Sequence, residues 1–116
     1  MSTSPLAKQS FTACSKDAPL VTADQYPSLL SELTDWSIIT EDSVDKLVKS
    51  YQFDNFVEAL EFTNKVGALA ELFNHHPLIQ TEWGNTRVVW WTHKIKGLHQ
   101  NDFILAAKTD ELTIEN

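Results

Sequence analysis

The sequence has little cysteine, glycine or proline, and it has no long apolar run. Its 116 residues include one cysteine, three glycines and four prolines. A single cysteine, Cys14, cannot form an internal disulfide, and the N-terminal residues lack the hydrophobic core of a secretory signal, so we expect a cytoplasmic protein. No apolar run approaches the roughly 20 residues that span a bilayer, so no membrane association is expected.

Basic residues are scarce as well. The chain carries 9 Lys and Arg against 16 Asp and Glu, a formal net charge of -7. Nucleic-acid phosphates are bound by clustered basic side chains, and here these are scattered, so direct nucleic-acid binding is not expected. The length fits one domain with a single core. We expect a flexible N-terminal arm over residues 1–19, which show no periodicity, and one domain over residues 20–116.

Hydrophobic periodicity predicts three helices and four strands. A capping-box pattern at Thr22 opens a first helix, whose apolar face extends from Tyr26 to Leu33; Pro27 moves its expected start nearer to Tyr26. Residues 36–40 and 47–53 form a hairpin, and a long helix follows from about residue 56 to 73. Gly67 within that helix suggests a close approach to the sheet. Two more strands, 79–83 and 86–93, precede a last helix over 100–112. The order α-β-β-α-β-β-α predicts an α+β fold, a four-stranded antiparallel sheet with three helices on one face.

The strand over residues 86–93 is apolar on both faces. One layer of helices covers only one face of a sheet, so the second face is expected to meet another subunit. Self-association is therefore predicted.

Three of the four histidines fall at the predicted ends of elements. Pro77 is expected to set the end of the long helix, because it disfavours the helical conformation at His76. His75 and His76 should therefore point in different directions, and His93 ends the last strand. Imidazole both gives and takes protons near neutral pH, so the three suggest acid/base chemistry. Glu71 lies four residues before His75, and this spacing on a helix lets its carboxylate orient the imidazole.

Simpler interpretations apply to each residue taken alone. A histidine pair at a helix end is more often a solvated cap, and Asp102 suits the first turn of the last helix because of the helix dipole. His99 is expected at the surface. A three-histidine zinc site is disfavoured because adjacent histidines rarely converge on one tetrahedral ion and no cysteine joins them, so no metal is expected.

Several motifs together resemble the pterin-4a-carbinolamine dehydratase family. They are Ala-Glu-x-x-Asn-His-His-Pro at residues 70–77, Thr-His at residues 92–93, and Gly-Leu-x-x-x-Asp-x-x-Leu-Ala at residues 97–106, with Trp36 and the run over residues 49–56 upstream. The resemblance covers residues 20–112. Asn74 departs from the Asp that often precedes the histidine pair in the family.

The resemblance implies a function and a set of site residues. The family dehydrates 4a-hydroxytetrahydropterin to quinonoid dihydropterin without a cofactor, recycling the pterin of aromatic amino acid hydroxylases, and its members are homodimers or homotetramers. The implied catalytic residues are His75, His76 and His93, with acid and base roles assigned jointly around a shared cavity. The implied binding or supporting residues are Glu71, Asn74, Pro77, Trp91, Thr92 and Asp102. The alternative is a non-catalytic assembly module or transcriptional cofactor of the same fold.

Overall fold

The computed structural model describes residues 20–113, so the predicted arm over residues 1–19 lies outside the described residues. The elements are η1 (Ala23–Gln25), α2 (Tyr26–Leu30), β1 (Ser37–Glu41), β2 (Val44–Gln52), α3 (Phe56–Phe73), β3 (Leu78–Glu82), β4 (Asn85–Trp90), η2 (His93–Ile95) and α4 (Gln100–Glu111). This order confirms the predicted one. No helix within the described range is long and apolar enough to cross a membrane.

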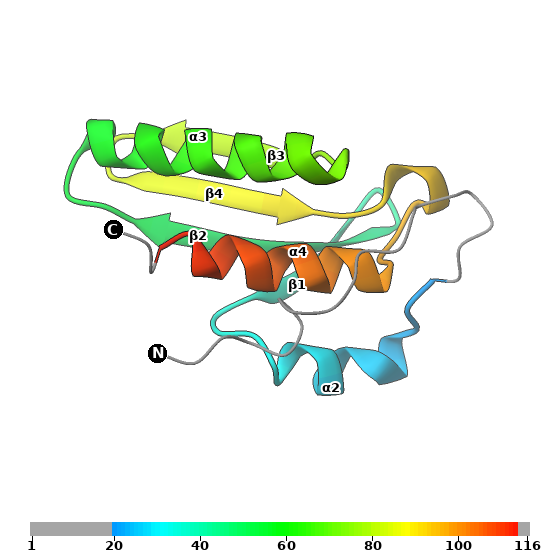
Figure 1. The fold of residues 1–116 in the computed structure, drawn as a ribbon. Coiled ribbons are helices and arrows are strands. Elements are labelled where there is room, and N and C mark those ends of the chain that lie inside the picture. Colours follow the sequence, from blue (N-terminus) through cyan, green and yellow to red (C-terminus); the bar gives the residue numbers. More distant parts are fainter. Residues whose placement is uncertain (1–19, 114–116) are drawn as a thin grey trace.

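The four strands form one antiparallel sheet in the order β1-β2-β4-β3. Helices α3 and α4 lie on the same side of this sheet (Figure 1). Alternate residues of β4 are buried beneath them, namely Thr86, Val88 and Trp90. Leu47 of β2 pairs with Trp90 and shares this face. The core is therefore one layer between sheet and helices, as the α+β prediction requires.

The first predicted helix is shorter than expected. The Gln25 side chain accepts a hydrogen bond from the Thr22 N–H at 2.9 Å, which confirms the capping-box contact. The segment then begins as a 3-10 turn and becomes the α-helix α2 only at Tyr26. Pro27 lies in the first turn of α2, where a missing N–H costs no helical hydrogen bond.

Asparagines mark both ends of α3. The Asn55 side chain accepts a hydrogen bond from the Glu58 N–H at 2.8 Å and caps the first turn. Asn74 adopts the left-handed conformation with φ 51°, and this ends the helix at Phe73. The helix therefore stops before Pro77 can act on His76, so the prediction that Pro77 sets its end was wrong. Asparagine tolerates this conformation better than most residues.

The prediction for Gly67 was also wrong. A Cβ atom built at Gly67 meets no atom within 4 Å, so no close approach to the sheet requires a glycine there. Gly84, in the β3–β4 turn, is the constrained position. It has φ +74°, and an added Cβ would lie 3.1 Å from the Phe53 carbonyl oxygen. The Phe53 N–H donates to the Gly84 carbonyl at 2.9 Å, which ties the turn to the chain after β2.

A carboxylate near the C-terminal end of α4 ties the helix to the sheet. Asp110 accepts hydrogen bonds from the Trp36 indole N–H at 3.1 Å and from Lys49 Nζ at 2.8 Å. The Tyr51 hydroxyl donates to the same carboxylate. Burial, and then the charge of Asp110, raise the pKa of Tyr51 well above its usual range. These contacts join α4 to β2 and to the residue before β1.

The second face of the sheet is partly buried within the chain itself. Val89 is 1% exposed because it lies between Val48 of β2 and Leu78 of β3 in register. Leu78, on this same face, is 42% exposed, and other large exposed apolar side chains occur at Leu20, along α3 and at the β3–β4 turn. The subunit contact expected on the second face stays a prediction.

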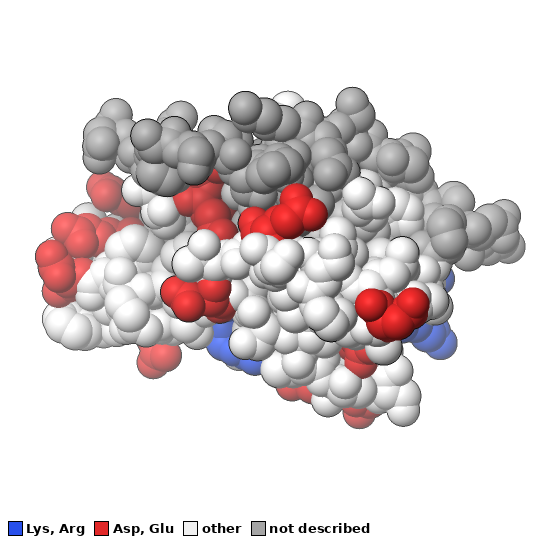
Figure 2. All heavy atoms as spheres, turned by 90° about the horizontal axis from the view of Figure 1, so that it is seen from below, with Lys and Arg blue, Asp and Glu red and all other residues white. Residues whose placement is uncertain are grey.

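Acidic side chains dominate the charge on one described face. Seen from below, Asp and Glu are spread among uncharged residues, and the visible Lys and Arg side chains lie at the margins (Figure 2). A polyanion would meet electrostatic repulsion over the described part of this face.

Candidate active site

The predicted site residues lie at one end of the sheet, where α3 ends, β4 ends and α4 begins (Figure 1). Three short segments supply them. The residues after and within the last turn of α3 are Glu71, Asn74, His75, His76 and Pro77; those after β4 are Trp91, Thr92 and His93; and Asp102 lies in the first turn of α4.

His75 pairs with Asp102 and not with Glu71. His75 Nε2 lies 2.8 Å from Asp102 Oδ1, and the two side chains are 7% and 0% exposed. The predicted Glu71–His75 pair is wrong because α3 ends at Phe73, so His75 no longer follows the helical spacing. The His75 ring also stacks on Trp90, with centroids 5.8 Å apart and planes 16° apart. The imidazole is held between an aromatic face and a buried carboxylate.

Asp102 uses both carboxylate oxygens. Oδ1 faces His75, while Oδ2 accepts from the Thr92 hydroxyl at 2.7 Å and from the backbone N–H of His99 at 2.9 Å. When the Asp102 carboxylate is ionised it only accepts hydrogen bonds, and Nε2 of His75 then carries the hydrogen of that contact. A buried carboxylate with several donors is well satisfied, and its orientation is fixed. Asp102 therefore does more than complement the helix dipole.

His76 forms a separate, exposed pair. Its Nε2 lies 2.7 Å from Glu71 Oε2, and the side chains are 54% and 79% exposed. The left-handed turn at Asn74 carries the chain away from the helix axis, which sends the adjacent His75 inward and His76 outward. Pro77 then leads into β3 and is half-buried. The prediction that the two histidines point in different directions is confirmed, with the Glu71 partner exchanged.

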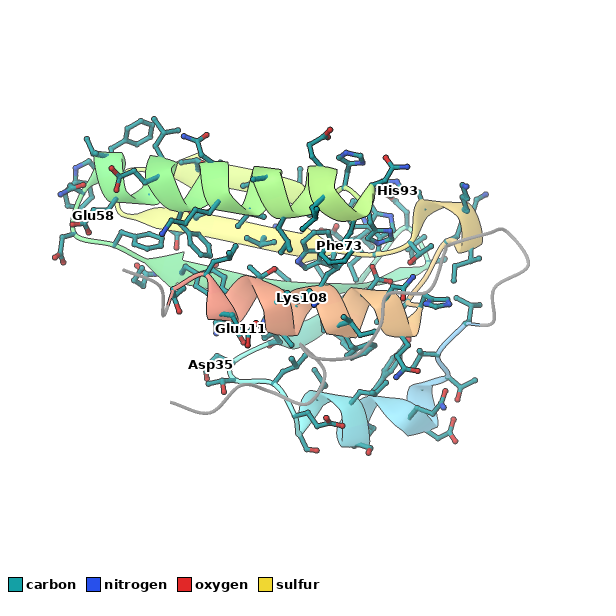
Figure 3. The ribbon with its side chains drawn as sticks, in the orientation of Figure 1. Asp35, Glu58, Phe73, His93, Lys108 and Glu111 are labelled. Carbon is teal, nitrogen blue, oxygen red and sulfur yellow. The ribbon has the colours of Figure 1, made fainter. Side chains whose placement is uncertain are left out.

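His93 follows β4 but does not end it. The strand stops at Trp90, and His93 is the first residue of the 3-10 turn η2. Its exposed ring packs against Trp91 with centroids 4.4 Å apart, and Lys46 Nζ lies 4.2 Å from the centroid of the Trp91 ring. In the view of Figure 3, His93 lies at the end of the sheet where α3 ends. The predicted strand was too long because Thr92 bonds to Gly97 across a tight loop.

His99, expected at the surface, is buried and caps α4. Its Nδ1 accepts a hydrogen bond from the Asn101 N–H at 2.9 Å, and the imidazole is 7% exposed. Burial lowers the pKa of His99 below its ordinary value of 6.5; the Asp102 charge opposes this shift and His75 adds to it. The signal in the sequence was its place three residues before Asp102, the spacing of a capping box.

The described residues contain one further feature of interest, a cavity of about 330 Å³. It lies between the N-terminal segment, the β1–β2 turn and the loop before α4, and its lining includes Tyr26, Asp45 and Lys96. None of the nine predicted site residues lines this cavity. Within residues 20–113, no group of three or more His, Cys, Asp or Glu side chains is arranged to hold a metal ion. The shared cavity expected around the three imidazoles stays a prediction.

Comparison with known proteins agrees with the fold and with the motifs. The chain is 56% identical over 107 residues to a protein of Syntrophotalea carbinolica, covering 92% of this chain and 96% of the relative. It is 57% identical over 100 residues to one of Nitrosococcus oceani, covering 86% and 88%. The names of both relatives assign them to the pterin-4-alpha-carbinolamine dehydratases.

Solved structures share the fold at lower identity. A transcriptional coactivator/pterin dehydratase from Brucella melitensis superimposes with a TM-score of 0.73 at 23% identity, over 81% of this chain and 98% of that one. A pterin dehydratase-like protein, identified as a RuBisCO assembly factor in the alpha-carboxysome, gives a TM-score of 0.59 at 18% identity, over 72% of this chain and 94% of that one.

The family described as pterin 4 alpha carbinolamine dehydratase matches residues 19–112. The chain therefore belongs to the pterin 4 alpha carbinolamine dehydratase family, which is a family of hydro-lyases.

Proposed function

We propose that this protein dehydrates 4a-hydroxytetrahydropterin to quinonoid dihydropterin and water by histidine acid/base catalysis. The single observation that carries the proposal is the buried His75–Asp102 pair, at the same end of the sheet as His76 and His93. Loss of water from the carbinolamine requires a proton on the departing 4a-hydroxyl and removal of the proton on N5. Positioned imidazoles suit both transfers because their ordinary pKa lies near neutral pH.

His75 contributes a fixed nitrogen. When Asp102 is ionised it accepts the hydrogen of Nε2, and this contact fixes the tautomer of the His75 ring. The stack on Trp90 and the buried carboxylate hold the ring in one orientation. Orientation of a reacting group in advance lowers the entropy cost of reaching the transition state.

His76 and His93 contribute exposed imidazoles. Glu71 orients His76 through Nε2, so Nδ1 of His76 is the exchanging atom when the Glu71 carboxylate is ionised. Trp91 supports the face of His93, and Lys46 packs on the same indole. One buried and two exposed imidazoles supply both an acid and a base, and the three share these roles. Thr92 acts by holding Asp102, while Asn74 and Pro77 shape the turn that separates His75 from His76.

The proposed biological role is pterin recycling. The quinonoid dihydropterin formed here would return to an aromatic amino acid hydroxylase after reduction. The functional partner is then the hydroxylase that releases the carbinolamine, in the same compartment, which we propose is the cytoplasm.

The test uses freshly generated carbinolamine and follows quinonoid dihydropterin by stopped-flow absorbance. The variants are His75→Ala, His76→Ala and His93→Ala, with Ser28→Ala on the exposed surface of α2 as the control. A positioned acid or base contributes about 100- to 10,000-fold in rate, so each histidine variant should lose much of kcat while the control keeps it. Wild-type rates in all three histidine variants would refute the proposal.

We also propose that the chain forms a homodimer or homotetramer, and that the outer surface of α3 supplies a contact in addition to the one expected on the second face of the sheet. Phe56, Val57, Leu60 and Leu72 are exposed on α3, and Trp83 at the β3–β4 turn is 71% exposed. Contiguous exposed apolar side chains mark association surfaces. Sedimentation should show an oligomer that Leu60→Glu dissociates. A wild-type monomer without dehydratase activity would instead favour the alternative function, an assembly or transcriptional-cofactor module that offers this surface to another protein.

A further inference from the structure

The N-cap of α4 is an unusual residue for its position. N-caps are ordinarily Ser, Thr, Asp or Asn, whose side-chain oxygen accepts a backbone N–H of the first turn whatever the pH near neutrality. Here the acceptor is Nδ1 of His99, 2.9 Å from the Asn101 nitrogen. A ring nitrogen that accepts a hydrogen bond cannot also carry a hydrogen. The cap therefore exists only while the His99 imidazole is neutral.

The same turn orients the Asp102 carboxylate. The backbone N–H of His99 donates to Asp102 Oδ2 at 2.9 Å, in a capping box that runs in both directions. The other oxygen of this carboxylate faces His75 Nε2 at 2.8 Å. His99 and His75 thus lie on opposite sides of one carboxylate that is fully buried. Any change in the backbone at residue 99 moves the group that holds His75.

We propose that His99 is a positioning residue for His75, because its neutral imidazole caps α4 and the cap holds the Asp102 carboxylate against His75 Nε2. His99 does not touch the pterin in this proposal. Its action on the reaction passes through Asp102, so it rests on the proposed catalytic role of His75.

The arrangement couples the site to pH. Two titratable groups act on the His99 imidazole, Asp102 from the first turn of α4 and His75 from the segment after α3. Protonation breaks the bond to Asn101 and places a positive charge at a helix N-terminus, where the helix dipole disfavours it. Burial lowers the pKa of His99 in the folded protein below the ordinary histidine pKa of 6.5. The stabilisation by the cap is therefore complete above pH 6.5, and it is lost as the pH falls from 6.5 through the lowered pKa of the folded protein.

Two substitutions separate capping from other roles of the imidazole. His99→Ser keeps a side-chain acceptor that does not titrate, whereas His99→Ala removes the cap. Relative to wild type, His99→Ala should lower kcat about fivefold with little change in KM. A factor of about five is the ratio that corresponds to the free energy contributed by a typical N-cap. His99→Ser should keep the kcat of the wild type at neutral pH and retain a larger fraction of it below pH 6.5 than the wild type does. Both variants are assayed with freshly generated carbinolamine over a range of pH.

A nitrogen-15 NMR measurement tests the geometry without activity. In the wild type, His99 should be neutral with its hydrogen on Nε2, and His75 should carry a hydrogen on Nε2. As the pH falls and His99 titrates, the His75 Nε2 resonance should shift with the same midpoint. This measurement uses the wild-type protein, so it applies even if His99→Ala does not fold. It also separates the two proposals: absence of turnover would contradict the dehydratase activity, whereas the His75 resonance tests the role of His99.

Three results would overturn the proposal. The first is a His99→Ala variant with the kcat and pH profile of the wild type. The second is a His99→Ser variant that loses as much kcat as His99→Ala, since the serine restores the cap. The third is a His75 resonance that does not respond when His99 titrates.

Discussion

Asp102→Asn is the substitution that best tests how the buried carboxylate works. Its shape is nearly unchanged, but an amide offers one oxygen acceptor and one NH₂ donor in place of two acceptors. The backbone N–H of His99 can only donate, so the amide oxygen should remain where Oδ2 now lies. The NH₂ group then faces His75 Nε2, which must become an acceptor. The hydrogen of the imidazole is thereby moved to Nδ1.

The magnitude follows from the contacts. A hydrogen bond to a charged group contributes about 1.5–3 kcal/mol, and the variant weakens one such bond directly, so we expect a loss of about 2 kcal/mol in the free energy of unfolding. For a domain of this size, this corresponds to a fall in Tm of about 8–16 °C. The changed tautomer alters which nitrogen of the His75 ring carries the hydrogen, so the proton transfer assigned to this ring is lost and kcat should fall by about 100-fold or more.

The assay combines urea unfolding with stopped-flow dehydration kinetics at a temperature where the variant is folded. Asp102→Ala serves as a comparison, since it leaves three buried donors without an acceptor and should lose more stability than Asp102→Asn. A folded Asp102→Asn protein with kcat within about threefold of the wild type would refute the reasoning, because general acid/base catalysis contributes far more than that.

Three further predictions concern other parts of the chain. Gly67→Ala should stabilise the protein by up to about 1 kcal/mol in urea unfolding, because the added methyl meets open space in a helix. Gly84→Ala, at φ +74°, should destabilise it by about 1–2 kcal/mol. Changes of the same sign in the free energy of unfolding would contradict the account of the two glycines. Glu71→Gln should change the free energy of unfolding by less than about 0.5 kcal/mol, since its pair is exposed, and a larger loss would show that the pair is structural. Burial and Asp45 raise the pKa of Tyr26 to about 12, and the pKa of Tyr51 is raised further. The native protein should therefore show little tyrosinate absorbance until near pH 12, whereas the tyrosines of the urea-unfolded protein should titrate near pH 10.0. Since both groups keep their protons longer in the folded state, stability should also fall as the pH rises above 10.0, and a native titration midpoint near 10.0 would contradict both statements.

Much of the fold could be predicted because its signals are local. The alternation of residues in β2, the run of β-branched and aromatic residues in β4, the helical spacing in α3 and the capping pattern at Thr22 each depend on near neighbours in the chain. The Gly67 prediction failed because a glycine in a helix has several causes, and only the packing around it shows whether a close approach is among them. The first helix was overestimated because a capping pattern marks a start but does not fix a length.

The site was predictable in its residues but not in its pairings. The histidine motifs identified the segments, yet the partner of His75 is Asp102, 27 residues away in the sequence. The left-handed turn at Asn74 decides this pairing, since it takes His75 off the helix and leaves Glu71 to His76. The capping role of His99 was missed because histidine is rarely an N-cap. A polar residue near the start of a helix was therefore expected to be exposed to solvent.

The two carboxylates on α4 have a consequence for how the domain opens. Asp102 fastens the first turn to the loops around His75, and Asp110 fastens the last turn to Trp36, Lys49 and Tyr51. A helix clamped at both termini cannot fray from either one without breaking a network shared with the sheet. Amide protons of α4 should therefore exchange with solvent only when the whole domain unfolds, and proteases should find no partially detached form of this helix to cleave.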